Sequence, residues 1–492
     1  MNMIPPQDEG RLRAAASGTL PNGKAVVVNT DGTVSVITAS GGDPSFGTAV
    51  VFNSAICSYI GSGFDSNANR VVVAYGDGGN SGKGFAVVGS VSGSTITFGT
   101  PVVFENGGTL QQMISPPNTT VIFDSNLNRI VILYRDTNSK GSAIVGTVAA
   151  GDNSISFGTA VVFSDNTGTR SISGCFDSNS NKVVIAFDQG DPGKAVVGTV
   201  AAGDNSISFG TIVAMESGEI GAISCAFDSN LNKVVVAYTD GGNSTYGTAI
   251  IGTVSSTSIS FGTAVVFRST ITSEILTAFD DNSNKVVIAF KGGATPDGGD
   301  GNKGSMIVGT VSGTGISFGT AVIFYNAAIS GTLAATWDTT SNVVIAGYDV
   351  GGTSYPIVAG TVSGTSISFA AKGDLGVNVA SGASPTFDSN SNRIVWSYDP
   401  DAVSRVGTSK VQALSPPNIT TENYIGISSG GAVASGSSAS IDIIGTVNED
   451  QTSLTAGQSY YVQTDGTIGL AADDPSVFAG TAISATKLLV KA

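Results

Sequence analysis

Short hydrophobic runs alternate with clusters of Gly, Asn, Asp and Ser along almost the whole chain. The runs are rich in valine and isoleucine, as in Lys182–Phe187, and runs of this kind bounded by turn residues are typical of β-strands. Residues that favour helices are scarce. The pattern therefore predicts an all-β protein whose large core is built from many short strands.

An aromatic residue followed by Asp recurs along the chain and defines a repeat. Four positions after each Asp comes an Asn, then usually Lys or Arg, and then a valine-rich run. Because the aromatic residue holds an equivalent position in every copy, we expect it to be buried in the core. The seven copies, 50 to 59 residues apart, are Phe64–Asp65, Phe123–Asp124, Phe176–Asp177, Phe227–Asp228, Phe279–Asp280, Trp337–Asp338 and Phe387–Asp388.

A second motif, Phe-Gly-Thr followed by an aliphatic run, alternates with the first. It begins at Phe46, Phe98, Phe157, Phe209, Phe261 and Phe318, with a degenerate copy at Phe369. A third strand, of the type Ala249–Val254, lies between the two motifs. Four short strands in about 50 residues is the period of a β-propeller blade, because one blade cannot bury both faces of its sheet alone. Strand counting favours seven blades and leaves eight incomplete blades as the alternative.

The connections within the repeat fall into two classes. In Asp177–Lys182 the Asp side chain can accept hydrogen bonds from backbone N–H groups two residues on, and Asn tolerates the left-handed conformation of a tight hairpin. The connection after the valine-rich run varies in length, as in Asp240–Ser244 and Gly292–Lys303. Variation in one class of loop indicates one face of a ring, where repeat proteins often bind partners.

Composition changes along the chain suggest four segments. They are an N-terminal anchoring segment (1–23), the propeller repeats (24–414, including a hairpin at 24–38), a linker (415–422) and a β-rich C-terminal domain (423–492). In the C-terminal domain, alternating residues predict strands at Ser440–Val447, Gln458–Gln463, Ile468–Ala471 and Thr486–Val490. About 70 residues is small for an independent core, so we expect this domain to pack on the propeller or on copies of itself.

Charge restricts the class of partner. The chain has a net charge of −15 and a pI near 4.3, with 41% hydrophobic and 12% charged residues. It has no basic stripe that could release counterions from a polyanion, so we expect no nucleic acid and no anionic membrane among its partners. The first 16 residues lack an apolar segment, and no run of about 18 apolar residues follows, so we expect neither a signal peptide nor insertion into a membrane.

Catalytic chemistry has little support in the sequence. The chain has no histidine, which removes Ser-His-Asp and Cys-His catalysis and His-ligated metals. Cys57, Cys175 and Cys225 lie in or near predicted strands, where buried thiols are expected rather than disulfides. The Gly76–Gly84 stretch lacks the strand and helix of a phosphate-binding loop. We therefore predict that the protein is not an enzyme and has no cofactor.

Two binding sites can be considered among the polar residues. Asp228, Asn230 and Asn232 alternate like the start of a calcium loop, but Lys233 stands where such a loop needs glycine, so a hairpin turn is the favoured interpretation and no metal is predicted. Tyrosines in or near the variable loops could stack on sugar rings but could equally pack within hairpins, so the ligand-binding residues remain unknown. These tyrosines are Tyr246, Tyr325 and Tyr355.

The two ends of the chain resemble structural proteins of tailed phages, especially marine ones. The resemblance lies in Asn423–Ser428, Leu454–Gln463 and Gly480–Val490, and in Ala16–Gly23 leading into Ala25–Thr33. It implies a virion component such as a tail fibre, an appendage or a head-surface protein, with other virion proteins and a host glycan or receptor as partners. Phage appendages are frequently trimeric, so by analogy we expect a homo-oligomer. A secreted or surface lectin-like propeller and a polysaccharide-degrading propeller enzyme are the alternatives.

Overall fold

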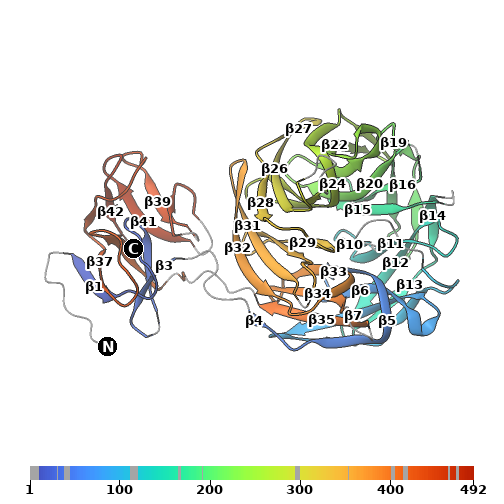
Figure 1. The fold of residues 1–492 in the computed structure, drawn as a ribbon, viewed down its shortest axis with the longest axis horizontal. Coiled ribbons are helices and arrows are strands. Elements are labelled where there is room, and N and C mark those ends of the chain that lie inside the picture. The colour runs from blue at the N-terminus through green and yellow to red at the C-terminus, as the bar shows by residue number, and fades with distance from the viewer. Residues whose placement is uncertain are drawn as a thin grey trace. The chain divides into compact units, whose positions relative to one another are not determined.

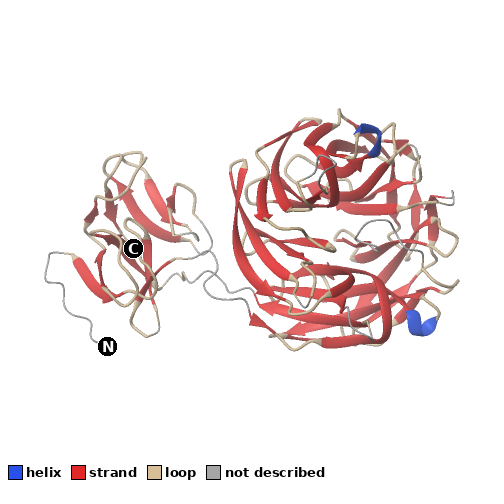
Figure 2. Cartoon of the chain, viewed as in Figure 1, coloured by secondary structure: helices blue, strands red, loops and turns tan. Residues whose placement is uncertain are grey.

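The protein is described by a computed structural model over residues 10–29, 31–37, 45–110, 120–164, 168–190, 192–293, 300–352, 354–400, 405–413, 419–420, 422–463, 466–472 and 476–491. The chain divides into two compact units, and each is described by itself. The propeller unit is residues 44–413, and the terminal unit combines residues 1–43 with 414–492. Strands make up nearly all the regular structure of both units (Figure 2).

The propeller unit is a closed ring of seven four-stranded antiparallel blades in the described residues (Figure 1). Each inner strand contacts the inner strands of the two neighbouring blades, and the seventh contacts the first. This arrangement confirms the predicted β-propeller and settles the blade number at seven. The inner strands are β5 (Val50–Asp65), β10 (Thr120–Asp124), β15 (Ser171–Asp177), β20 (Ile220–Asp228), β24 (Val265–Asp280), β29 (Leu333–Asp338) and β33 (Val379–Asp388).

The next two strands of each blade carry most of the buried aliphatic side chains. The second strands are β6 (Arg70–Asp77), β11 (Arg129–Arg135), β16 (Lys182–Asp188), β21 (Lys233–Asp240), β25 (Lys285–Gly292), β30 (Val343–Tyr348) and β34 (Arg393–Pro400). The third strands are β7 (Lys83–Ser92), β12 (Gly141–Ala149), β17 (Lys194–Val200), β22 (Tyr246–Ser255), β26 (Gly304–Ser312), β31 (Pro356–Ser363) and β35 (Val406–Ala413). Two short 3-10 helices follow second strands, η1 (Gly78–Asn80) and η2 (Gly241–Asn243).

The outer strand of most blades is interrupted after its Phe-Gly-Thr motif. The outer strands are β8 (Thr95–Phe98) with β9 (Val102–Glu105), β13 (Ser154–Phe157) with β14 (Val161–Ser164), β18 (Ile207–Phe209) with β19 (Val213–Ala214), β23 (Ser258–Phe261) with the start of β24, β27 (Gly315–Phe318) with β28 (Val322–Tyr325), β32 (Ser366–Asp374), and β4 (Ser45–Phe46) with the start of β5. The last of these pairs with β35, so the N-terminal edge of the propeller completes blade 7 and closes the ring.

Connections between strands alternate between the two faces of the ring because neighbouring strands in a blade are antiparallel. We call the face that holds the inner-to-second and third-to-outer connections the turn face. The loop face holds the second-to-third connections and those that lead to the next blade. The variable connections identified in the sequence therefore share the loop face.

The seven inner-to-second turns have one geometry. In blade 4, Asp228 Oδ1 accepts hydrogen bonds from the N–H groups of Asn230 (3.0 Å) and Leu231 (2.9 Å). The equivalent Asp of every other blade accepts one or two such bonds. The Asn four positions after each Asp has φ between 51° and 55°. These bonds confirm the predicted turn, in which the Asp side chain caps the backbone of the hairpin.

Rings from adjacent blades interlock in the interior. Phe104, on the outer strand of blade 1, lies 5.1 Å from Tyr134 and 6.2 Å from Phe157, both in blade 2. Phe52, Phe163, Phe267 and Phe324 hold equivalent places at four other blade interfaces. Such pairs each contribute about 0.5–1.5 kcal/mol beyond their area burial. These aromatic trios therefore join neighbouring blades.

The aromatic residue of the first motif is less central than expected. Phe387 is 9% exposed, whereas the other copies, including Phe227, are only partly buried. Each lies next to last on its inner strand, at the turn-face end, where the side chain is no longer covered on all sides. Most of the fully buried aromatic residues are instead on the second strands, for example Tyr75, Phe187 and Tyr238.

The glycine of the Phe-Gly-Thr motif is required by the next blade. A Cβ on Gly262 would lie 2.0 Å from the carbonyl oxygen of Thr314, in the third-to-outer turn of blade 5. The same contact occurs at five other copies. Blade 6 has Ala370 at this position, and blade 7 beyond it has no third-to-outer turn because its outer strand comes from β4. Ring closure thus explains why the seventh copy is degenerate.

The terminal unit corrects the predicted domain boundaries. The hairpin at 24–38 was assigned to the propeller, but β2 (Ala25–Val28) pairs with β36 (Tyr424–Ser429). From the N-terminal segment, β1 (Arg11–Ala15) pairs with β37 (Ser438–Asp442), and β3 (Val34–Val36) completes this sheet. Both regions therefore belong to one domain, and the propeller is inserted between its halves.

A second sheet of five strands completes the terminal unit. Its strands are β38 (Val447–Asn448), β39 (Ser459–Val462), β40 (Ile468–Gly469), β41 (Val477–Ala482) and β42 (Leu488–Val490). Ala25 and Val27 of the first sheet pack in one core with Val477 and Leu488 of the second. The predicted strands at 458–463, 468–471 and 486–490 overlap these, whereas 440–447 contains the end of β37 and the start of β38. The proposed linker residues 415–418 lie outside the described residues.

Candidate functional site

Buried carboxylates occur where six of the seven second strands reach the loop face. They are Asp77, Asp136, Asp188, Asp240, Asp349 and Asp399, none more than 8% exposed. Most hold the following connection: Asp77 Oδ1 accepts the N–H of Gly79 (2.9 Å), and Asp349 Oδ1 that of Gly351 (2.6 Å). Burial raises the pKa of Asp188 and of Asp240. These groups order the loop face, and blade 5 alone has Lys291 and Gly292 in their place.

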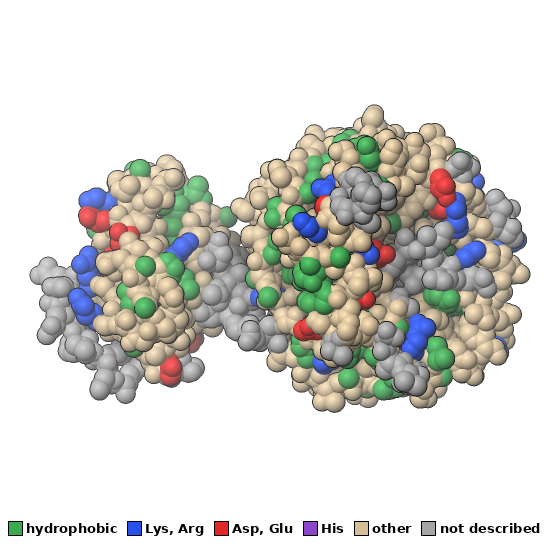
Figure 3. Space-filling view, in the orientation of Figure 1, with side chains coloured by type: hydrophobic (Ala, Val, Ile, Leu, Met, Phe, Trp, Pro, Cys, Tyr) green, Lys and Arg blue, Asp and Glu red, His purple; other side chains and the backbone are tan. Residues whose placement is uncertain are grey.

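Ion pairs link separate connections of the loop face. Arg170, on the connection that leads into blade 3, contacts Asp188 at the end of β16 (3.0 Å) and Glu219 on the connection that leaves blade 3 (2.6 Å). Arg268 contacts Asp300 at 2.8 Å. Except for the buried Asp188, these side chains are partly exposed, and an exposed ion pair contributes about 1 kcal/mol or less to folding, so these pairs mainly fix loop positions. On the side drawn in Figure 3, charged groups are scattered singly or in small groups.

The ring axis contains a narrow cavity of about 170 Å³ lined by all seven inner strands. Hydroxyl groups join neighbouring strands there: Ser62 Oγ donates to the Ser384 carbonyl (2.9 Å), and Thr277 N–H donates to Ser224 Oγ (2.9 Å). Its lining holds small, aliphatic and hydroxyl side chains. Cys225 also lines it, and burial raises the pKa of this thiol to about 12, so it is a protonated packing group at neutral pH.

The three tyrosines considered for sugar stacking occupy different environments. Tyr355 is fully buried, with its ring centroid 6.2 Å from that of Trp396, so its ring cannot stack on a sugar and that hypothesis is wrong for it. Tyr325 is partly buried and lies 4.9 Å from Tyr348. Tyr246 is partly buried at the start of β22. Neither of the latter two lies in a described cavity.

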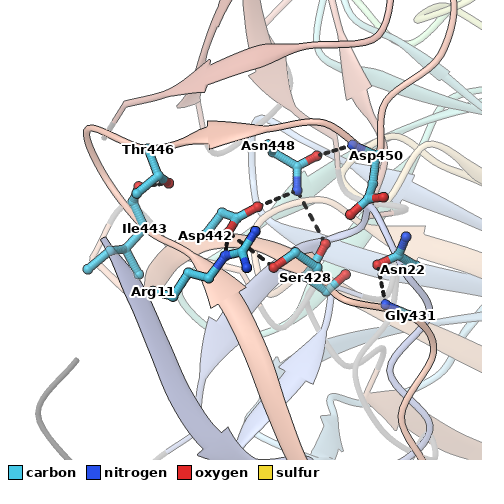
Figure 4. A network of polar contacts seen from close by, with 10 residues as sticks. Arg11, Asn22, Ser428, Gly431, Asp442, Ile443, Thr446, Asn448 and Asp450 are labelled. Atoms are coloured by element: carbon cyan, nitrogen blue, oxygen red, sulfur yellow. Dashed lines mark hydrogen bonds and ion pairs between the residues drawn. The ribbon is translucent and has the colours of Figure 1, made fainter. Parts of the chain in front are cut away.

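The terminal unit has a buried polar network around Asp442 (Figure 4). Asp442 Oδ1 accepts hydrogen bonds from Arg11 Nε (2.9 Å) and Ser429 Oγ (3.1 Å), and Oδ2 accepts one from Asn448 Nδ2 (2.9 Å). Gln451 Nε2 donates to Asn448 Oδ1 (2.7 Å). Because Arg11 is at one end of the chain and the others are near the opposite end, the network fastens the two halves of this domain together.

An open hollow of about 510 Å³ lies beside Arg11 and Asp442. Its rim includes Thr446 and the exposed side chains of Ile444 (59%) and Val447 (36%). In the part of the chain that the structure describes, no group of three or more His, Cys, Asp or Glu is placed to hold a metal ion. No helix among the described residues is long and apolar enough to cross a membrane.

Comparison with known proteins bears on the fold. No protein-family model matches the sequence, and no curated protein is significantly similar to it. Among solved structures, the BP39L lectin from Burkholderia pseudomallei matches with a TM-score of 0.54 at 10% identity, over 75% of this chain and 98% of the lectin. The larger unit is a β-propeller.

Two further solved structures match with lower scores. Sqt1 from Saccharomyces cerevisiae matches with a TM-score of 0.44 at 12% identity, over 82% of this chain and all of Sqt1. The Dos1 propeller matches with a TM-score of 0.45 at 9% identity, over 76% of this chain and 95% of that one.

Proposed function

We propose that the protein is a non-enzymatic structural protein of a phage virion, a fibre, tail appendage or head-surface protein, whose propeller attaches to a host surface or glycan. The observation that carries this proposal is the insertion of the propeller into the terminal unit. The two ends that resemble phage structural proteins form one domain through the pairing of β1 with β37 and of β2 with β36. One unit is thus suited to assembly with other virion proteins, and the other to display.

The difference between the two propeller faces supports an attachment role. The turn face repeats one capped turn around the ring, whereas the loop-face connections differ from blade to blade. A rigid scaffold with divergent loops on one side is the usual arrangement of a recognition surface. We expect this face to contact the host, and we expect copies of the chain to associate as a homo-oligomer, with a trimer as the first arrangement to test.

Immunogold labelling of particles and soluble fractions from the source tests the virion assignment. Gold at a fixed position on particles is the expected result. Label confined to the soluble or cell-surface fraction would contradict it and favour a free lectin-like propeller, a role that the BP39L lectin fold makes reasonable. A reducing-sugar assay on host polysaccharide addresses the third candidate, because sustained release of sugar ends would identify an enzyme instead.

A further inference from the structure

Two cysteines lie on the neighbouring inner strands of blades 3 and 4, Cys175 on β15 and Cys225 on β20. The Cys225 N–H donates to Ser173 Oγ (3.1 Å), and its Sγ lies 3.6 Å from the Ser173 carbonyl oxygen. Side chains alternate along a strand, so Cys175, two residues after Ser173, projects from the same side of β15. Both thiols therefore point into one interface, and they pack against the same core cluster.

The interface between blades 7 and 1 shows how close these two positions come. Ser62, like Cys225, is two residues before the aromatic residue of the first motif, and Thr386, like Cys175, is one residue before it. Ser62 makes both contacts that Cys225 makes: its N–H and its Oγ donate to the Oγ and carbonyl of Ser384, each at 2.9 Å. Its Oγ also lies 2.5 Å from Thr386 Oγ1. By the same register, the Cys225 sulfur faces the Cys175 sulfur.

The interface between blades 1 and 2 gives the separation of the side-chain origins. Gly63 stands there in the place of Cys175, and Val121 in the place of Cys225. A Cβ on Gly63 would lie 3.2 Å from the Val121 Cβ, close to the roughly 3.5–4.5 Å between the two Cβ atoms of a disulfide. Burial and the nearby Cys225 both raise the pKa of Cys175, which agrees with a close approach.

The interface that the two thiols share lacks an aromatic trio. Met215 holds the place that Phe163 holds one blade earlier, and it packs in one cluster with Tyr238 and Phe261. A thioether fills the space flexibly, but it supplies no third ring. A covalent bond at this interface would therefore join two blades at a place where ring packing is incomplete.

The cavity on the ring axis gives a small oxidant access to the pair. Cys225 lines this cavity of about 170 Å³, and both thiols are partly exposed. Burial raises the pKa of each thiol, so the reactive thiolate is scarce at neutral pH and the reaction is slow. We propose that Cys175 and Cys225 close into a disulfide between blades 3 and 4 when the protein passes from a reducing to an oxidising environment, with a peroxide as the oxidant.

Oxidation by hydrogen peroxide proceeds in two balanced steps. The Cys225 thiolate attacks one peroxide oxygen and the O–O bond breaks, which leaves a sulfenic acid on Cys225 and a hydroxide that takes up the proton lost by the thiol. The Cys175 sulfur then attacks the Cys225 sulfur, and its proton leaves with the sulfenic hydroxyl as water. Two thiols and one peroxide thus give one disulfide and two waters.

Peptide mapping of the full chain by mass spectrometry tests the bond. The folded protein is treated with hydrogen peroxide at mildly alkaline pH, its remaining thiols are alkylated, and it is digested without reduction. We expect a linked peptide that joins Cys175 to Cys225 and that a reductant separates. Because the bond closes a loop of about 50 residues, we also expect the melting temperature to rise by about 5 °C and to fall back on reduction.

Three single variants and one double variant decide between the outcomes. Cys57→Ser, which removes the remaining thiol, should form the same linked peptide, whereas Cys175→Ser and Cys225→Ser should form none and should keep their melting temperature on oxidation. Ser62→Cys combined with Thr386→Cys places thiols at the equivalent positions between blades 7 and 1, and it should form a second linked peptide.

Three results would overturn the proposal. The first is a folded wild type, verified by circular dichroism, in which both thiols are still alkylated after oxidation. The second is a sulfinic or sulfonic acid on Cys225 beside a free Cys175, which would show that the sulfur atoms do not meet. The third is a bond that joins two chains, visible as a dimer on a non-reducing gel. Failure of the double variant to link would reject the register from which the pair is inferred.

Discussion

The turn face and the loop face of the propeller lie at opposite ends of the same strands, yet the sequences of their connections are constrained in different ways. On the turn face, each blade repeats an Asp-capped turn ending in a left-handed Asn, and the motif glycine is pressed against the next blade. On the loop face, buried Asp residues recur in six blades, but the connections that follow them differ in length and charge. The turn geometry is therefore repeated on the turn face, whereas the length and charge of the connections vary on the loop face.

The comparison shows which repeated residues are structural. Repetition on the turn face follows from blade-to-blade contacts that allow few alternatives, so it is no sign of seven equivalent ligand sites. The departures from repetition are more informative. Ala370 marks where the ring closes, and Lys291 with Gly292 marks the one blade of the described seven that lacks the buried Asp at the loop face.

The largest effect is expected in the layer between the faces. Phe104→Ala removes the centre of an aromatic trio and should lower the free energy of unfolding by about 3–5 kcal/mol. Phe227→Ala, at a partly buried position near the turn face, should cost clearly less. Urea unfolding monitored by circular dichroism measures both. Equal losses of stability would contradict this prediction, because Phe227 would then stabilise the propeller as much as Phe104 does.

The constraint on the turn face can be tested with one methyl group. Gly262→Ala would place its Cβ against the Thr314 carbonyl, so we expect a loss of about 1–3 kcal/mol from overpacking. Blade 6 already carries Ala370 where no turn follows. Ala370→Gly is therefore the matched control and should cost no more than about 1 kcal/mol, the usual entropic cost of glycine in a strand. If Gly262→Ala leaves the free energy of unfolding unchanged, the proposed close contact between blades is wrong.

A pH effect should distinguish the loop face. Burial raises the pKa of Glu274 to about 6 from an ordinary value of 4.5. Between these values the folded protein binds more protons than the unfolded chain, so this residue favours folding increasingly as pH falls from 7 to 4.5. Relative to Glu274→Gln, the wild type should gain about 1–2 kcal/mol over that range. Urea unfolding of both proteins at pH 4.5, 5.5 and 7 gives the difference, and parallel pH profiles would contradict it.

The smallest effect is expected at a single turn. Asp228→Ala removes the acceptor of two backbone hydrogen bonds and should cost about 0.5–2 kcal/mol, as loss of a capping side chain does elsewhere. Because the carboxylate serves the turn, chelator should leave the melting temperature of the wild type unchanged. A fall of several degrees with chelator, restored by calcium, would revive the metal interpretation of the Asp-Asn pattern.

Much of the propeller could be predicted because its signals are local. Asp228 and Asn232 specify a hairpin within five residues, and the fixed spacing of such hairpins identifies a blade. Burial of Phe227 was overestimated, since recurrence shows that a position matters but not how far it lies from the edge of the ring. The match between Gly262 and a turn in the next blade likewise exists only once blades are stacked.

In the terminal unit, local sequence patterns predict strands but not their pairing partners. Alternation at Ala25–Val28 correctly predicts a strand, but nothing in it distinguishes the outer edge of a blade from β36, some 400 residues away. The cavity on the ring axis is harder still, because its lining comes from seven strands that meet only when the ring closes.

The insertion of the propeller also has a mechanical consequence. Ser45 and Ala413, the first and last described residues of the propeller, are directly paired across β4 and β35. Both connections to the terminal unit therefore leave from the same end of one ladder, and the terminal unit joins their other ends through its own sheet. A pulling force applied between the two units would load the two connections in parallel, without separating β4 from β35. The ring is thereby protected from being unzipped at its seam.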